Sequence, residues 1–311
     1  MGRVSSLRRW SAVAVAAPAL VVGSVALTGA TAGAASPKPL TILVTNDDGY
    51  NSPGINTLVQ ALRKLPKVTV KVVAPATNQS GTGGKTTPGT LATTNVKTLS
   101  GYPAVAVQGY PADTIRAAID QLHIRPNLVV SGINFGQNLG PVADLSGTVG
   151  AARAAAVLGI PAVATSQGLG SPVAYPVTAK AVITWINSHR SKLAVTKTPK
   201  STIVNINGPS CGTTGSPRGT VNVPPGTSGN PLATSDCSST ATNPPDDVTA
   251  LAEGFIVVDQ LPATAATTTT TPRPDRAHTV TPDRVRPQAF ESYRASTAAS
   301  RASDSSGESR W

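Results

Sequence analysis

The fold is decided by the stretch LTILVTNDDG, residues 40–49. Its first half is an apolar run with β-branched members, which is typical of a buried strand. Two adjacent carboxylates, Asp47 and Asp48, and then Gly49 follow that strand directly. Alone, Asp-Asp-Gly is more typical of a turn than of a functional site. Whether Asp-Asp-Gly is a turn or part of a functional site therefore depends on which other residues the fold brings beside it.

The segments after this stretch alternate between helix and strand patterns. Ser52 and Pro53 fit the cap and first turn of a helix, and residues 55–62 continue it with apolar residues at helical spacing. Further strands are predicted at 67–74, 104–108, 127–130 and 160–165, and further helices at 115–122, 149–158 and 177–188. Successive β-α-β units imply parallel strands with right-handed crossovers. We therefore predict an α/β protein with a Rossmann-like, mostly parallel sheet and helices on both faces.

The C-terminal third has a different composition from this α/β core, which we assign to residues 36–200. Short strands are predicted at 202–207, 220–223 and 255–261, and they indicate a small β extension over residues 201–262. A segment rich in Gly, Pro, Ser and Thr, residues 208–247, interrupts the extension as a loop insert. Residues 263–311 have almost no apolar periodicity, so they cannot bury enough surface to offset their ordering entropy. We expect a disordered tail there.

The N-terminus, residues 1–35, has the pattern of a secretory signal peptide. A basic start is followed by a small, apolar run at 11–27 and by a cleavage motif near Ala34/Ala35. The alternative is an uncleaved anchor, which proline and glycine within the apolar run disfavour. We expect export, with the product secreted or associated with the cell envelope and without stable membrane insertion. Adjacent arginines in the basic start leave twin-arginine export open.

Cysteine content and charge restrict the compartment and the partners. The mature part contains Cys211 and Cys237, which we expect to form a disulfide in an oxidising compartment, the alternative being two unpaired thiols. The net charge of the chain is +11, which favours anionic partners. Aromatic residues are not interleaved with the basic ones, so we expect no nucleic-acid binding.

Polar side chains follow three of the predicted strands. Asp47 and Asp48 follow the first strand, a loop with Ser80 follows the second, and Asn134 follows the strand at 127–130. In open α/β sheets the carboxyl ends of the strands face one crevice, so we expect these side chains to converge. Carboxylate, hydroxyl and amide oxygens suit Mg²⁺, Mn²⁺ or Ca²⁺ better than metals bound by thiolate or imidazole. The pattern predicts a divalent-metal site.

An anion site is predicted beside the metal. Ser146, Gly147 and Thr148 come directly before the Ala-rich helix, whose free N–H groups and positive dipole end attract phosphate. The glycine-spaced loop 134–140 lets the backbone approach a ligand closely.

Taken in order, these blocks resemble the SurE family of metal-dependent nucleotidases and phosphatases. The blocks are VTNDDG (44–49), SPG (52–54), VAP (73–75), NQSG (78–81), PAD (111–113), SGINFGQNLG (131–140) and SGTV (146–149), with a C-terminal signature within 247–255. The resemblance covers roughly residues 40–262. It implies a Rossmann-like sheet whose C-terminal extension often mediates dimers or tetramers. It also implies hydrolysis of nucleoside 5′- and 3′-monophosphates, and in some members of polyphosphate or other phosphomonoesters.

The resemblance also implies roles for individual residues. The metal ligands correspond to Asp47, Asp48, Ser80 and Asn134. The phosphate contacts correspond to Asn138, Ser146, Gly147 and Thr148. Ala76, Tyr110 and Leu145 stand where the family commonly has an acidic residue, a threonine and an aromatic residue, so base and leaving-group preference stays open.

We therefore expect an exported phosphomonoesterase that uses one divalent ion, Mg²⁺ or Mn²⁺, and acts on a small nucleotide or phosphomonoester as a homodimer or tetramer. Asp47, Asp48 and Asn138 are the expected catalytic residues, and a covalent intermediate through Asp47 stays open. Alternatives are a non-catalytic nucleotide- or phosphate-binding protein and a secreted interaction protein that acts through residues 208–247. No G-x-G-x-x-G follows the first strand, which disfavours a Rossmann oxidoreductase. An esterase elbow around Ser131 or Ser166 and chemistry at the histidines, 123, 189 and 278, are also disfavoured.

Overall fold

The computed structural model describes residues 2, 37–193, 195–196, 198–213 and 215–265. Among them, nine strands form a single sheet in the order β3-β4-β2-β1-β5-β6-β7-β9-β8. The strands are β1 (Leu40–Thr45), β2 (Val68–Pro75), β3 (Thr93–Lys97), β4 (Pro103–Val107), β5 (Leu128–Phe135), β6 (Ala162–Gln167), β7 (Thr202–Gly208), β8 (Thr220–Asn222) and β9 (Ile256–Pro262). The predicted signal peptide lies outside the described residues, except for Gly2, and so does the predicted tail from residue 266 onward.

Most neighbouring strands are parallel, as predicted. Strand β1 pairs in parallel with β2 and β5, and the same direction continues through β6 and β7. The antiparallel pairs are β3 with β4 and β7 with β9. The predicted C-terminal strands are all present, and they continue the same sheet because β7 pairs with β6. The Rossmann-like α/β fold class is confirmed.

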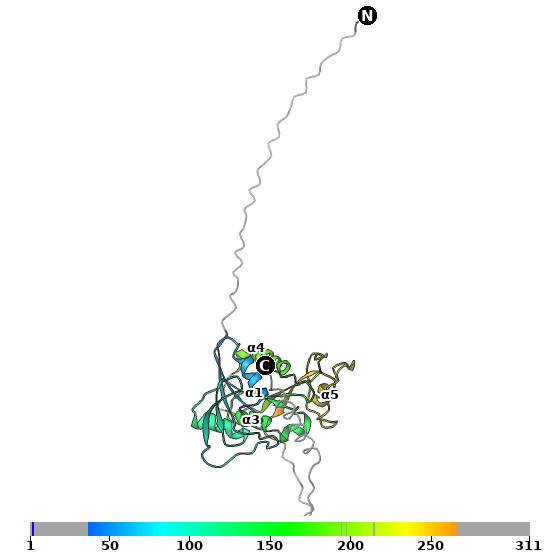
Figure 1. Cartoon of the computed structure of the whole chain (residues 1–311). Coiled ribbons are helices and arrows are strands. Elements are labelled where there is room, and N and C mark those ends of the chain that lie inside the picture. Colours follow the sequence, from blue (N-terminus) through cyan, green and yellow to red (C-terminus); the bar gives the residue numbers. More distant parts are fainter. Residues whose placement is uncertain (1, 3–36, 194, 197, 214, 266–311) are drawn as a thin grey trace, which may run out of the picture. The chain divides into compact units, whose positions relative to one another are not determined.

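Helices cover both faces of the sheet (Figure 1). They are α1 (Pro53–Leu62), α2 (Pro111–Arg116), α3 (Gly147–Val157), α4 (Tyr175–His189) and the short α5 (Asp247–Ala252). Helices α1 and α4 bury Ile55 and Ile186 against one face, while α2 and α3 bury Ile115 and Val149 against the other. Helix α3 packs through buried alanines, which let its backbone approach β5 and β6 closely. Its N-terminus lies beside Asp47, just after β1.

Several segments differ from the sequence-based boundaries. Strand β5 runs to Phe135 instead of ending at Val130, because β6 pairs with it on both sides of a register shift between Ser131 and Asn134. These two polar residues therefore lie in the strand and not in a loop. Strand β3 was not predicted, because its side chains are mostly exposed and polar and only its pairing with β4 reveals it.

Shorter helical segments also depart from expectation. The predicted helix at 115–122 begins earlier, at Pro111, and continues from α2 into a π-helical turn, η1 (Ala117–Gln121). A 3₁₀ helix, η2 (Gly140–Leu145), occupies part of the expected loop before α3, and another, η3 (Arg190–Lys192), follows α4.

The C-terminal part packs around a core of its own. Leu139, Val248, Leu251 and Val257 form a third apolar cluster that joins α5 and β9 to the loop before η2. Cys211 and Cys237 form a disulfide, as expected, within the segment 208–247, which lies beside α5 in Figure 1. The predicted tail begins at Ala263, but this residue is only 6% exposed. Its N–H donates to Ser201 O at 2.9 Å and prolongs the β7–β9 ladder.

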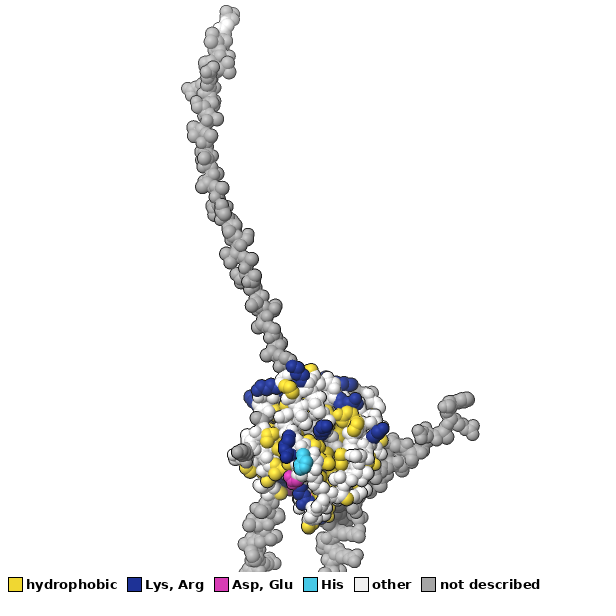
Figure 2. Space-filling view, turned by 90° about the vertical axis from the view of Figure 1, so that its left-hand side faces the viewer, with side chains coloured by type: hydrophobic (Ala, Val, Ile, Leu, Met, Phe, Trp, Pro, Cys, Tyr) yellow, Lys and Arg dark blue, Asp and Glu magenta, His cyan; other side chains and the backbone are white. Residues whose placement is uncertain are grey.

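Charged side chains are scattered on the face of the molecule that Figure 2 draws. Figure 2 shows lysines and arginines spread singly among apolar and neutral side chains, with little acidic surface on that face. No helix in the part of the chain that the structure describes has the length and apolar character needed to span a bilayer.

Candidate metal and phosphate site

Asn46 holds the turn after β1. Its side-chain amide donates to Gly49 O at 3.0 Å and to Ser52 Oγ at 2.8 Å, and its Oδ1 accepts the Gly49 N–H at 3.2 Å. Gly49 has a φ of 101°, a conformation that favours glycine. Because Asn46 supplies the turn's hydrogen bonds, the carboxylates of Asp47 and Asp48 are not needed for that purpose.

Asp47 lies against the N-terminus of α3. Its carboxylate is 2% exposed and accepts a 2.6 Å hydrogen bond from Thr148 Oγ1, together with hydrogen bonds from the backbone of Gly147 and Thr148. Burial raises the pKa of the Asp47 carboxyl, and these hydrogen bonds oppose the rise. A Cβ on Gly147 would lie 2.8 Å from Asp47 Cβ and 2.9 Å from Pro111 Cγ. Glycine at 147 therefore permits the close approach of α3 to Asp47.

The three predicted segments converge around Asp48. Its Oδ2 accepts the Phe135 N–H at 3.1 Å, and its Oδ1 accepts the Asn78 amide at 3.4 Å. The backbone of Asp47 accepts the Gln79 N–H at 2.7 Å. The turn after β1, the loop after β2 and the end of β5 are thus joined by direct hydrogen bonds.

The donor set fits a hard divalent ion. Ser80 Oγ is buried and, within the described residues, has no hydrogen-bond partner, although polar atoms in protein interiors are normally satisfied. Asn134 is buried, and its amide nitrogen donates to Gly136 O at 2.6 Å, which fixes the orientation of the amide. The described part of the chain has no cluster of three or more Asp, Glu, His or Cys suited to a metal. An ion bound here would therefore combine two carboxylates with neutral oxygens.

A small cavity of about 50 Å³ lies beside Asp47. It is lined by Asp47, Gly81, Asn138, Val142, Leu145, Ser146 and Leu232. It joins the predicted metal position to two predicted phosphate positions, and it borders the insert through Leu232. Ser146 Oγ also accepts the Val149 N–H at 3.2 Å, so Ser146 caps α3 at the edge of this cavity.

Asn138 is positioned by residues that sequence reasoning missed. Its N–H donates to Asn207 Oδ1 at 2.8 Å, its carbonyl accepts from Asn205 Nδ2 at 2.9 Å, and its side-chain amide donates to Ser166 Oγ at 2.8 Å. The only signal in the sequence is a pair of polar residues at alternate positions in the otherwise apolar strand β7. That pattern does not say which partner they bind.

Asp247 ties the site loop to the insert. Its carboxylate accepts the Gly140 N–H at 2.8 Å and the Gly226 N–H at 2.6 Å.

Asp259 is buried beside Asp247. Burial, followed by the adjacent Asp247, raises the pKa of Asp259 well above the usual value. Asn205 Nδ2 approaches Asp259 Oδ2 at 3.3 Å. A proton held on Asp259 thus relieves repulsion between two buried carboxyl groups.

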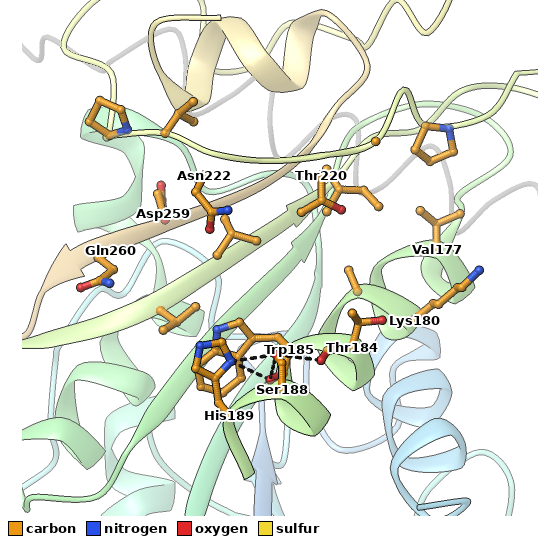
Figure 3. A pocket seen from close by; sticks show the side chains of 18 of the residues that line it. Val177, Lys180, Thr184, Trp185, Ser188, His189, Thr220, Asn222, Asp259 and Gln260 are labelled. Atoms are coloured by element: carbon orange, nitrogen blue, oxygen red, sulfur yellow. Dashed lines mark hydrogen bonds between the residues drawn. The ribbon is translucent and has the colours of Figure 1, made fainter. Parts of the chain in front are cut away.

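A second hollow, larger than the cavity beside Asp47, lies elsewhere (Figure 3). Its volume is about 1060 Å³, and α4 faces β8 and β9 across it, with Lys180, Trp185 and Gln260 among its lining. The rings of Trp185 and His189 stack with centroids 4.4 Å apart. None of the predicted site residues lines this hollow. Its volume therefore does not identify it as the candidate catalytic site.

Comparison with known proteins decides the family. Residues 42–223 match the family model described as "Survival protein SurE". The chain belongs to the SurE family. The predicted family is confirmed, and the matched range includes every predicted metal-ligand and phosphate-contact position but leaves out residues 224–247 of the insert.

Related proteins extend this match. The SurE chain is 39% identical over 179 residues to a "5′-nucleotidase SurE" of Paramagnetospirillum magneticum, which covers 56% of this chain and 66% of that protein. Identity to the protein of the same name from Methanopyrus kandleri is 46% over 129 residues, or 40% and 48% of the two chains. The crystal structure of the SurE protein from Aquifex aeolicus is similar with a TM-score of 0.58 and 27% identity, over 73% of this chain and 95% of that one. The chain thus spans about half to two thirds of the curated relatives that it matches.

Proposed function

We propose that this SurE protein is an exported, divalent-metal-dependent phosphomonoesterase that hydrolyses nucleoside 5′- and 3′-monophosphates. The observation that carries the proposal is the contact between Asp47 and the N-terminus of α3, beside a cavity that also borders Asn138. This contact supports the proposal, because the Asp47 carboxylate lies beside a helix N-terminus, a position that favours anions such as phosphate. The names of the curated relatives support the same activity.

Asp47, Asp48, Ser80 and Asn134 would hold the ion. When bound, a Mg²⁺ or Mn²⁺ ion supplies Lewis-acid polarisation of the phosphate and activates water. The buried carboxylate of Asp47 is held by Thr148, and Asp48 is held by the Phe135 N–H, so neither must reorganise to bind a cation.

The chain's other contribution is to orient the phosphate. The N-terminal turn of α3, from Ser146 to Thr148, would act on the phosphoryl oxygens through the positive end of the helix dipole, because the N–H groups of Gly147 and Thr148 donate to Asp47. Asn138 presents its amide to the same cavity, and Ser166 fixes the orientation of that amide. Preorganised donors of this kind lower the barrier because they need no rearrangement as charge moves to the leaving oxygen.

The test is phosphate release from nucleoside monophosphates by EDTA-stripped, full-length mature protein, before and after Mg²⁺ or Mn²⁺ is restored. We expect activity only with a restored ion, and an Asp47→Asn variant that folds but loses that activity. A non-catalytic nucleotide-binding protein would bind the same compounds, as seen by calorimetry, without releasing phosphate. Metal-dependent activity that is unchanged in folded Asp47→Asn would refute the assignment of Asp47.

We also propose that the protein is cleaved near Ala34/Ala35 and exported, and that it works as a homodimer or tetramer. N-terminal sequencing of protein recovered outside the cells tests the cleavage, and a mature chain that begins at Met1 refutes it. Light scattering of the mature protein tests the assembly, and a monomeric mass at assay concentration refutes it.

A further inference from the structure

The small cavity has a polar and an apolar part. Asp47, Asn138 and Ser146 are buried, whereas Leu145 is 56% exposed and Leu232 is partly exposed. The polar groups therefore lie deep, and the leucines lie toward solvent. Val142 and Leu145 come from η2, and Leu232 comes from the insert, so two segments far apart in sequence form the apolar rim.

Contacts on both sides of Leu232 hold it at the rim. The next residue, Ala233, accepts a 2.9 Å hydrogen bond from Gln137 Nε2, and Gln137 Oε1 in turn accepts the Leu169 N–H at 2.7 Å. The N–H of Leu232 donates to Asn230 Oδ1 at 3.1 Å. Further along, the disulfide at Cys237 ties the segment down. Leu232 is thus held in place from both directions along the chain.

The polar end of the cavity has room for a small group. Its volume of about 50 Å³ exceeds the roughly 10–15 Å³ that a single water needs, so a phosphoryl group can approach Asn138 and Ser146 there. With the phosphoryl group at the buried polar end, the leaving group of an ester lies on the solvent side, beside the rim leucines. Because the rim side chains are apolar, they bind a leaving group by burying its apolar surface and not by hydrogen bonds.

We propose that Leu232 is a specificity-determining residue, which with Leu145 and Val142 selects phosphomonoesters whose leaving group presents an apolar or aromatic face. Nucleosides and aryl groups meet this requirement, and polyols do not. The inference rests on the proposed function and deepens it, because it assigns selectivity to a segment outside the family match.

The experiment compares two substrates of equal charge, 4-nitrophenyl phosphate and glycerol 1-phosphate, with the divalent ion fixed. We expect Leu232→Ala to lower the ratio of their kcat/KM values about fivefold, through the aryl substrate alone, since part of an apolar contact is lost. Leu232→Met keeps the apolar volume and should keep the ratio. Leu99→Ala is the matched control, because Leu99 is a 54% exposed leucine that does not line the cavity.

The outcomes separate the two proposals. No turnover of either ester or of nucleotides by the wild type would refute the proposed function itself. If Leu232→Ala turns over the substrates with an unchanged ratio of kcat/KM values, or loses kcat/KM equally for both, the proposed role of Leu232 is wrong. The proposed phosphatase function is unaffected by that result. Should Leu232→Ala fail to fold, Leu232→Gln replaces it, because glutamine keeps the length of the side chain but removes the apolar end, and the same fall in the ratio is expected.

Discussion

Thr148 Oγ1 donates a 2.6 Å hydrogen bond to Asp47 Oδ1 and joins two residues that lie 101 positions apart in the sequence. Both side chains are buried. The resemblance to the family gave Thr148 the role of a phosphate contact, and in the structure its hydroxyl orients a proposed metal ligand. This contact joins the proposed metal-binding part of the site to the proposed phosphate-binding part.

Thr148→Val keeps the shape of the side chain and removes the donor. We expect apparent Mg²⁺ affinity and kcat/KM each to fall about tenfold, as is common when a partner of a metal ligand is lost. Thr148→Ser retains the hydroxyl and should stay close to the wild type. Metal titrations followed by phosphate release give both quantities, and wild-type affinity in folded Thr148→Val would contradict the role.

Gly147→Ala puts a methyl group 2.8 Å from Asp47 Cβ. Because Pro111 closes the other side at 2.9 Å, α3 must shift, and overpacking of this kind costs about 1–3 kcal/mol of unfolding free energy. We expect lower stability in urea denaturation together with strongly reduced activity. Gly84→Ala is the control, since no atom lies within 4 Å of a Cβ at that position. Equal stabilities of the two variants would disprove the packing argument.

Asp259→Asn should change how stability depends on pH. The pKa of Asp259 is raised above the usual value of about 3.9, so the folded state holds this proton more tightly than the unfolded state. The unfolding free energy therefore falls as pH rises from that value through the raised pKa. Asparagine cannot ionise, so the unfolding free energy of the variant should increase relative to that of the wild type as pH rises. Urea denaturation from pH 4.5 to 7.5 measures this, with the exposed Asp120→Asn as control. If the unfolding free energies of wild type and Asp259→Asn change with pH in parallel, Asp259 does not cause the pH dependence.

Replacing Cys211 and Cys237 by serine opens a loop whose ends are 26 positions apart. The lost restriction of the unfolded chain corresponds to about 3 kcal/mol of stability in the chain-entropy view. We expect a lower melting temperature for the double serine variant, and a similar decrease for the wild type under a strong reductant. A reductant that lowers the melting temperature of the double variant as much as that of the wild type would show that the effect does not come from this disulfide.

The class of fold and the location of the candidate site follow from local sequence patterns. The apolar run before Asp47 and the helical spacing after Pro53 are local patterns, because strand and helix periods repeat within a few residues. Asp47 and Ser80 could be assigned to one crevice, since the carboxyl ends of parallel strands share an edge. Most helix and strand positions agreed within a few residues. The exceptions are β3, which has no apolar pattern, the short helix α5, which was not predicted, and β5, which runs beyond Val130 to Phe135.

The residues that orient the candidate site and those that enclose it become apparent from the packing of the chain. From the sequence, Asn205 and Asn207 are only polar residues in a strand, and their hydrogen bonds to Asn138 appear in the folded chain. Likewise, Leu232 lies in a glycine- and proline-rich insert, and its position depends on Gln137 and on the disulfide. The hydrogen bonds join residues more than 60 positions apart, and the disulfide joins residues 26 positions apart. No local period encodes such pairs, because they depend on how the sheet, α3 and the insert pack together.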